Sequence, residues 1–395
     1  MPANDPGVLD KPVPFNTKLL DRLMDDAGLD VLLATSKHNI QYLLGGYRFF
    51  FYDTMEAIGI SRYQNALVYQ KGKPENSAYF GCRTENFEKE LGKFWTPGLE
   101  LTSLSPVEAM QNAAGHIASL GGVRRVGVEH DFLPASGLAA LSRSLRNIEI
   151  GDAFLPLERL RALKSAQEIA YLRSASEKVV EAMGAAFKAC APGRNKSDIV
   201  ETLRRAEVER GLVFDYCLMT AGTSLNRAPS GQVLKAGDIV SIDSGANEKG
   251  YIGDLCRMGI IQTAPDPELV DLLGWIEEVQ QATRARVTPG VNGGEILKTG
   301  DSMVLNSPHR DYADFLAHGM GLVSHEAPRL RHMGKTTAYP GYDADRPLES
   351  GMVLSIETTM RHPKRGFIKL EDTILVTASG HEALGDGARG WNKAG

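Results

Sequence analysis

The sequence predicts two domains, an α/β domain over residues 1–157 and an α+β domain over residues 158–395. A chain of 395 residues exceeds the size of one ordinary hydrophobic core. In the first part, short apolar runs alternate with helical patterns, which is typical of α/β domains. In the second part, long helical patterns come first and strand patterns carrying acidic residues come last. These observations set the domain boundary near residue 158.

The first domain begins with an expected helix over residues 16–28. Leu19, Leu20, Leu23 and Met24 fall on one face of this helix, and Gly28 ends it. Short apolar runs then predict strands, at residues 31–34, 66–69, 78–80 and 125–129. No catalytic group of residues stands out in this domain.

The second domain begins with two expected helices, at residues 165–190 and 197–210. The segment Ala191-Pro-Gly193 separates them, and Ser197 is a suitable N-cap for the second. A third helix is expected near residues 266–287.

A predicted hairpin brings two aspartates together. The segment Asn247-Glu-Lys-Gly250 is a turn signal, and a turn centred between Glu248 and Lys249 would place Asp243 directly opposite Asp254. Cβ atoms of such a pair lie about 5 Å apart. Carboxylates this close repel each other unless they share a proton or bind cations.

Three further residues extend this acidic pair. His318 precedes a glycine-rich segment, and Glu357 and Glu371 lie on strand patterns where an unpaired carboxylate is costly to bury. The negative charges of the carboxylates would balance two divalent cations. An oxygen-rich set with one imidazole suits Mn²⁺, Co²⁺, Fe²⁺ or Zn²⁺.

The order of these residues resembles the pita-bread metallohydrolases. That family includes methionine aminopeptidase, aminopeptidase P, prolidase and creatinase. The match includes Asp243, Asp254, His318, Glu357 and Glu371 in this order. It also includes the segment His325-Glu-Ala-Pro, which begins seven residues after His318. The segment at residues 39–45 resembles the creatinase-type N-terminal domain. The resemblance implies a creatinase-type N-terminal domain, a pita-bread catalytic domain and a dinuclear metal-dependent hydrolase that cleaves a peptide or amide C–N bond.

The resemblance also implies roles at the site. Glu357 would combine metal ligation with proton transfer, since metal ions lower the pKa of water and a nearby carboxylate can take the proton. His325 is interpreted as a hydrogen-bond donor to the substrate carbonyl or oxyanion rather than as a ligand. Glu357 and His325 are therefore the predicted catalytic residues.

Departures from the family pattern fall around the substrate. Proline-specific members carry a histidine in the loop at residues 221–230, and this chain has none there. Their arginine two residues before the last glutamate is Lys369, which lacks a planar fork for a carboxylate. We expect His325, Lys369 and Asn226 to contact a substrate that is a dipeptide or another small molecule, with weak activity on Xaa-Pro dipeptides. The alternatives are a creatinase-, ectoine-hydrolase- or dimethylsulfoniopropionate-lyase-like enzyme, or a binding module without activity.

The aromatic run Tyr47-Arg-Phe-Phe-Phe-Tyr52 has two interpretations. Its rings fill the domain core or a dimer contact, as aromatic residues commonly do. The second interpretation is a wall that reaches the active site of a neighbouring subunit. The expected assembly is a homodimer.

Composition excludes several classes of partner. The formal net charge of −5 gives no electrostatic footprint for nucleic acid, and no apolar stretch is long enough to span a membrane. The chain begins without a signal-peptide pattern, so we expect a cytoplasmic protein. The cysteines show no Cys-x-x-Cys spacing and are expected to be reduced and buried.

Overall fold

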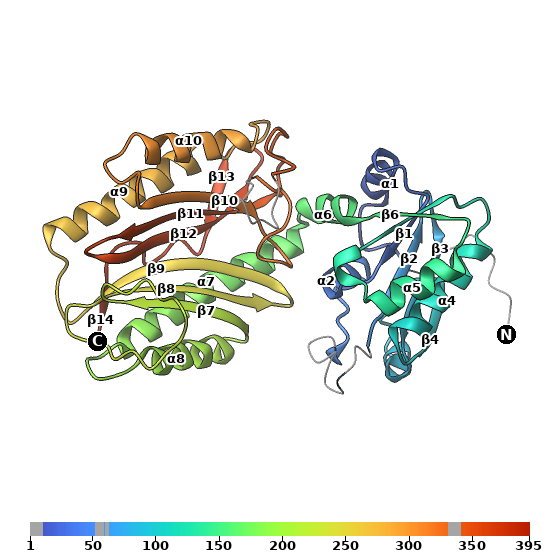
Figure 1. The fold of residues 1–395 in the computed structure, drawn as a ribbon, viewed down its shortest axis with the longest axis horizontal. Coiled ribbons are helices and arrows are strands. Elements are labelled where there is room, and N and C mark those ends of the chain that lie inside the picture. The colour runs from blue at the N-terminus through green and yellow to red at the C-terminus, as the bar shows by residue number, and fades with distance from the viewer. Residues whose placement is uncertain (1–10, 52–58, 60–62, 331–340) are drawn as a thin grey trace. The chain divides into compact units, whose positions relative to one another are not determined.

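The computed structural model describes residues 11–51, 59, 63–330 and 341–395, and the chain divides into two compact units (Figure 1). The units are Met1–Arg161 and Ala162–Gly395. The division lies beyond the expected boundary after residue 157 because helix α6 continues through it. Leu157 and Leu160 of that helix pack in a core of the first unit.

The described residues of the first unit form a six-stranded sheet in the order β4-β3-β2-β1-β5-β6. Its strands are β1 (Val31–Ala34), β2 (Ala66–Gln70), β3 (Lys73–Cys82), β4 (Gly98–Ser103), β5 (Arg125–Val128) and β6 (Glu149–Asp152). Its helices are α1 (Thr17–Asp26), α2 (Lys37–Leu43), α3 (Asn86–Lys89), α4 (Pro106–Ser119), α5 (Ala135–Ser144) and α6 (Phe154–Ala162).

Helices cover both faces of this sheet. Side chains alternate between faces along a strand, so Leu32 of β1 packs with α1, α2 and α6, whereas Val31 and Leu33 pack with α4 and α5. The predicted first helix is confirmed, and Gly28 follows it with a φ of +66°. The first unit is therefore the α/β layer arrangement that the sequence predicts.

The aromatic run packs mainly into the first unit. Tyr47 and Phe49 are buried in its core, and Phe51 stacks on Tyr63 with ring centroids 4.5 Å apart. Phe50 is 65% exposed. Tyr52 lies outside the described residues. The interpretation as core side chains is thus met by Tyr47 and Phe49, and Phe50 presents a ring at the surface.

The second unit is built on a larger sheet in the order β10-β11-β12-β9-β8-β7, to which β13 and β14 add at β12 and β9. Its strands are β7 (Val213–Ala221), β8 (Ile239–Glu248), β9 (Tyr251–Ile261), β10 (Ala313–Gly319), β11 (Val353–His362), β12 (Gly366–Val376), β13 (His381–Leu384) and β14 (Asn392–Ala394). Its helices are α7 (Ala166–Ala189), α8 (Lys196–Glu209), α9 (Pro267–Arg284) and α10 (Gly294–Leu305).

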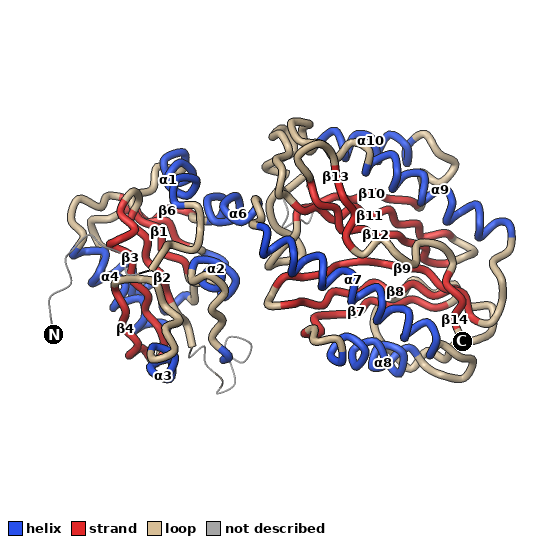
Figure 2. Tube along the Cα trace, turned by 180° about the vertical axis from the view of Figure 1, so that it is seen from behind, coloured by secondary structure: helices blue, strands red, loops and turns tan. Residues whose placement is uncertain are grey.

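Two pairs of helices cover this sheet. Helices α7 and α8 pack on β7, β8 and β9, and α9 and α10 pack on β10, β11 and β12 (Figure 1). Helix α7 lies across β9 (Figure 2), so closely that a Cβ on Gly253 would come within 2.6 Å of the backbone nitrogen of Ser176. Strand residues that alternate with these core positions face away from the helices.

Local signals at the helix starts agree only in part with the sequence prediction. Ser165 caps α7, and its hydroxyl accepts a hydrogen bond from the backbone N–H of Glu168. The predicted N-cap Ser197 is wrong, because the side chain of Asn195 accepts from the backbone N–H of Asp198 and α8 begins earlier. Helix α10, which begins at Gly294 with Gly293 as its N-cap, was not predicted from the sequence.

The register of the β8–β9 hairpin corrects the predicted pairing of the aspartates. Asp243 lies opposite Cys256, and Asp254 lies opposite Gly245. The turn residues are Lys249 and Gly250, with φ angles of 55° and 91°. Two positive φ angles are the mark of the tight hairpin turn that fits the strand twist. The turn centre therefore shifts by one residue, and the two aspartates become diagonal neighbours on one face.

The sequence predicts buried, reduced cysteines. All four cysteines are buried and free. Within the described ranges, no helix has both the length and the apolar character that crossing a membrane demands.

Candidate metal centre

Three carboxylates gather on the face of the second sheet that points away from its helices. Asp243 of β8, Asp254 of β9 and Glu371 of β12 bring ligand atoms within 4.8 Å of one another. All three side chains are buried. Glu371 Oε1 accepts a hydrogen bond of 2.8 Å from the hydroxyl of Ser355, while Asp254 Oδ1 is buried and has no hydrogen-bond partner among the residues that the structure describes.

A second group lies on the neighbouring strands. His318 of β10, Glu357 of β11 and His325 bring ligand atoms within 4.8 Å of one another. His318 Nε2 is 3.0 Å from Glu357 Oε1, and its Nδ1 is 3.0 Å from the carbonyl oxygen of Gly319. The His325 ring stacks on His318 at a centroid distance of 3.7 Å. His325 was predicted to be a hydrogen-bond donor rather than a ligand, and the loop after β10 brings its ring next to His318.

Strand pairing joins these two groups. Glu357 lies directly opposite Glu371 in the β11–β12 ladder, and Glu371 lies opposite Cys256 across β12 and β9. His318 is paired with Ser355 between β10 and β11. The five predicted ligands therefore come from neighbouring strands of one sheet.

Lys369 lies among the carboxylates. Its Nζ is 2.6 Å from Asp243 Oδ2, 2.6 Å from Glu357 Oε2 and 2.7 Å from Glu371 Oε2. The lysine is 3% exposed. Its ammonium group thus spans both groups of predicted ligands.

In the loop before β8, Arg227 contacts the metal-ligand group, whereas the sequence predicts Asn226 as the site residue. Asn226 is exposed, and its side-chain oxygen accepts a hydrogen bond from the backbone N–H of Ala228. The neighbouring Arg227 instead forms an ion pair with Asp243, and its guanidinium lies over the Phe367 ring at 5.1 Å. One sequence feature indicates the role of Arg227: it is the lone cation in the loop at residues 221–230, the loop in which proline-specific family members carry a histidine.

The buried acids titrate far from their ordinary ranges. Burial and the charges of Glu371 and Asp243 raise the pKa of Asp254 well above its usual value. Burial and the charge of Glu357 raise the pKa of Glu371 to about 7. Burial also acts to raise the pKa of Glu357, but Lys369 and His318 together hold that pKa below its usual range.

The two imidazoles and the lysine respond to the same charges. Burial acts to lower the pKa of His318, but Glu357 raises it above the usual value. Burial and the neighbouring His318 lower the pKa of His325 to about 3. Burial opposes the charge of Lys369, yet the carboxylates of Asp243, Glu357 and Glu371 raise its pKa well above normal. The acids therefore need cations, and Lys369 is one of them.

The residues present fit a divalent metal ion. Carboxylate oxygens and imidazole nitrogens are the donors that divalent first-row ions prefer in such sites. A buried carboxylate oxygen without a partner is costly, and Asp254 Oδ1 is such an atom. A cation bound beside Asp254 would remove this cost.

A second buried network fixes the backbone under the site. The Arg257 guanidinium donates hydrogen bonds of 2.7 Å to the carbonyl oxygen of Glu371 and 2.9 Å to that of Cys256. Asp372 pairs with Arg257 at 3.3 Å and accepts a hydrogen bond of 2.6 Å from the Gln280 side chain of α9. These contacts hold β12 against β9 and α9, which fixes where Glu371 points.

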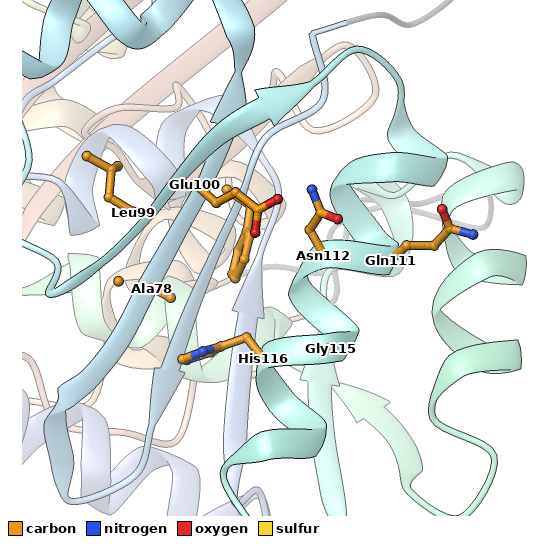
Figure 3. A pocket seen from close by; sticks show the side chains of 9 residues that line it. Ala78, Leu99, Glu100, Gln111, Asn112, Gly115 and His116 are labelled. Atoms are coloured by element: carbon orange, nitrogen blue, oxygen red, sulfur yellow. The ribbon is translucent and has the colours of Figure 1, made fainter.

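A separate pocket of about 480 Å³ lies in the first unit between β4 and α4 (Figure 3). Glu100, Asn112 and His116 line one part of it, and His116 Nε2 is 2.9 Å from the carbonyl oxygen of Asn76. None of the predicted site residues lines this pocket, so it is distinct from the metal-ligand cluster.

Comparison with known families matches both units. Residues 170–378 match the family described as metallopeptidase family M24. Residues 17–163 match the creatinase/prolidase N-terminal domain.

Individual relatives extend over nearly the whole chain. An Xaa-Pro dipeptidase of Pyrococcus horikoshii is 24% identical over 343 residues, which cover 84% of this chain and 93% of that protein. The uncharacterized peptidase YqhT of Bacillus subtilis is 24% identical over 371 residues, or 92% of this chain and 96% of the relative. The solved structure of an Xaa-Pro dipeptidase from Bacillus anthracis has a TM-score of 0.79 at 21% identity, with 96% of this chain and 100% of that chain covered.

Proposed function

The chain belongs to metallopeptidase family M24 and is a metal-dependent hydrolase, and we propose that it cleaves the C–N bond of a small peptide or amide. The family resemblance and the fold class predicted from the sequence, a creatinase-type domain followed by a pita-bread domain, are confirmed. The observation that carries the proposal is the convergence of Asp243, Asp254, His318, Glu357 and Glu371 on one sheet face.

In this proposal the five residues hold the metal. Bound divalent metal supplies a Lewis acid and lowers the pKa of water to near neutrality. The ligand set offers two places for a cation, one at Asp243, Asp254 and Glu371 and one at His318 and Glu357.

Glu357 is the proposed proton carrier. Its Oε1 contacts His318 Nε2 and its Oε2 contacts Lys369 Nζ, so both oxygens are held in fixed positions. A carboxylate fixed in this way can take a proton from the attacking water at Oε1 or Oε2 and return it to the leaving nitrogen. We assign to His325, whose ring stacks on His318, the donation of a hydrogen bond to the substrate carbonyl or the oxyanion.

The substrate shell supports a departure from proline dipeptides. A substrate carboxylate needs a cation, but the Lys369 ammonium group already contacts three protein carboxylates. The Asn226 side chain accepts a hydrogen bond from the backbone N–H of Ala228 within its own loop. Arg227 has a side chain that is 34% exposed, and it is the cation that we assign to the substrate carboxylate in place of Lys369 and Asn226. We therefore propose a small non-proline dipeptide or amide as substrate, processed by a cytoplasmic homodimer.

A substrate panel tests this proposal. The metal-loaded protein should hydrolyse non-proline dipeptides or small amides faster than Xaa-Pro dipeptides at equal concentration. Activity confined to Xaa-Pro dipeptides would overturn the altered substrate shell. Turnover of betaines or amidines with no peptide hydrolysis would instead favour the creatinase-like or lyase-like alternative.

A further inference from the structure

The cations already present at the metal centre change its charge balance. The carboxylates of Asp243, Asp254, Glu357 and Glu371 carry four negative charges when ionised, which two divalent ions would neutralise without help. Lys369 and Arg227 are both in ion-pair contact with this group. They offset two of those charges, and the remainder matches one divalent ion.

The geometry of Lys369 is that of a bound cation. Three oxygens from three different side chains surround Nζ at 2.6, 2.6 and 2.7 Å. An ammonium group is a compact point charge with three donors, so it can occupy such a position, whereas a planar guanidinium presents its donors in a flat fork. The lysine approaches from β12, the strand that also carries Glu371.

On the other side of the centre, no ammonium or guanidinium group of the described residues forms an ion pair with Asp254. Asp254 Oδ1 is buried and accepts no hydrogen bond among the described residues. Asp243, Glu357 and Glu371 contact the Lys369 ammonium group. A further cation would therefore be most strongly stabilised beside Asp254.

We propose that the Lys369 ammonium group takes one of the two cation places and that the protein holds a single tightly bound divalent ion beside Asp254. This rests on the proposed function, because it assigns the metal content of the same centre. A second ion enters only when Lys369 leaves its three carboxylates. Removing the lysine charge therefore adds a binding place.

Metal content is the direct test. The purified chain and the Lys369→Met variant are stripped with a chelator, loaded with Mn²⁺, dialysed and analysed for manganese per chain. Wild type should hold about one equivalent and Lys369→Met about two, the number of a dinuclear site. Lys164→Met is the matched control, since it removes a buried ammonium that pairs with Glu326 at 3.0 Å, and it should leave the content at about one.

Thermal stability of the metal-free proteins gives a second measurement. Both lysine variants should melt below wild type, because each removes a buried ammonium group that lies in ion-pair contact with buried carboxylates. Added Mn²⁺ should restore the Tm of Lys369→Met far more than that of Lys164→Met.

Two tight equivalents in wild type, or unchanged metal content in a folded Lys369→Met variant, would overturn the inference and leave the proposed hydrolase intact. One equivalent in a protein that hydrolyses no peptide or amide would overturn the proposed function and leave the inference intact.

Discussion

Replacing Glu207 by glutamine should remove a large part of the pH dependence of folding stability. Glu207 of α8 is fully buried, and its Oε1 is 2.9 Å from the hydroxyl oxygen of Ser244, the residue after Asp243. The same hydroxyl is 2.9 Å from the carbonyl oxygen of Tyr216, yet it has one hydrogen to donate. A protonated Glu207 resolves this conflict by donating to Ser244, which then donates to Tyr216.

The size of the effect follows from the pKa. Burial and the charge of Asp215 raise the pKa of Glu207 to about 8 from a model-compound value of 4.5. Between these two pKa values the folded state retains a proton that the unfolded state has lost, and this proton stabilises the fold. The contribution of Glu207 to the free energy of unfolding is therefore full below the pKa of the unfolded state and is lost as the pH rises toward the pKa of the folded state. Between about pH 5 and about pH 7.5 the free energy of unfolding should fall by about 3 kcal/mol from this group alone.

Urea unfolding at both pH values measures this change. A glutamine amide donates to Ser244 without titrating, so Glu207→Gln should lack the decline, and the stability difference between variant and wild type should shift by about 3 kcal/mol across the range. Glu209→Gln is the control, because Glu209 lies on the same helix and is exposed. Parallel pH profiles for wild type and Glu207→Gln would refute the protonated state of Glu207.

Other substitutions test the site and its support. Glu357→Gln should lower kcat by about 10²- to 10⁴-fold through lost proton transfer while a large share of the metal is retained, and unchanged kcat in a metal-loaded variant would exclude Glu357 as the proton carrier. His325→Ala should lower kcat/KM with unchanged metal content, and loss of metal in this variant would make His325 a ligand. Gly253→Ala should destabilise the fold by about 1–3 kcal/mol, because the new Cβ meets α7 backbone at 2.6 Å. Gly184→Ala, where nothing lies within 4 Å, should be neutral or stabilising in the same melts, and equal effects of both changes would contradict the close approach.

The sequence predicted the elements that depend on local patterns. The helix at Thr17–Asp26 follows from apolar spacing, and α7 follows from the helical pattern over residues 165–190. The strands that carry the predicted metal ligands were recognised by motif. The predicted pairing of Asp243 with Asp254 failed by one step because the turn signal contains more than one possible centre, and only the positive φ at Lys249 decides between them.

Long-range contacts were beyond the sequence patterns. Nothing local shows that Lys369 turns toward Asp243, since the two residues are 126 positions apart. Nor does any local pattern show that the loop arginine Arg227 pairs with Asp243. Charge balance at a buried site depends on such contacts, so the number of metal ions could not be derived from the ligand count alone.

The central claim is that the five converging residues make a metal-dependent hydrolase. The direct measurement is hydrolysis of a dipeptide panel by the purified chain before chelation, after chelation and after Mn²⁺ is returned, with Asp254→Asn in parallel. We expect activity to disappear with the metal and to return with it, and Asp254→Asn to lose both metal and activity because the amide removes a charge that the ion needs. Full activity in the metal-free wild-type protein would contradict the account.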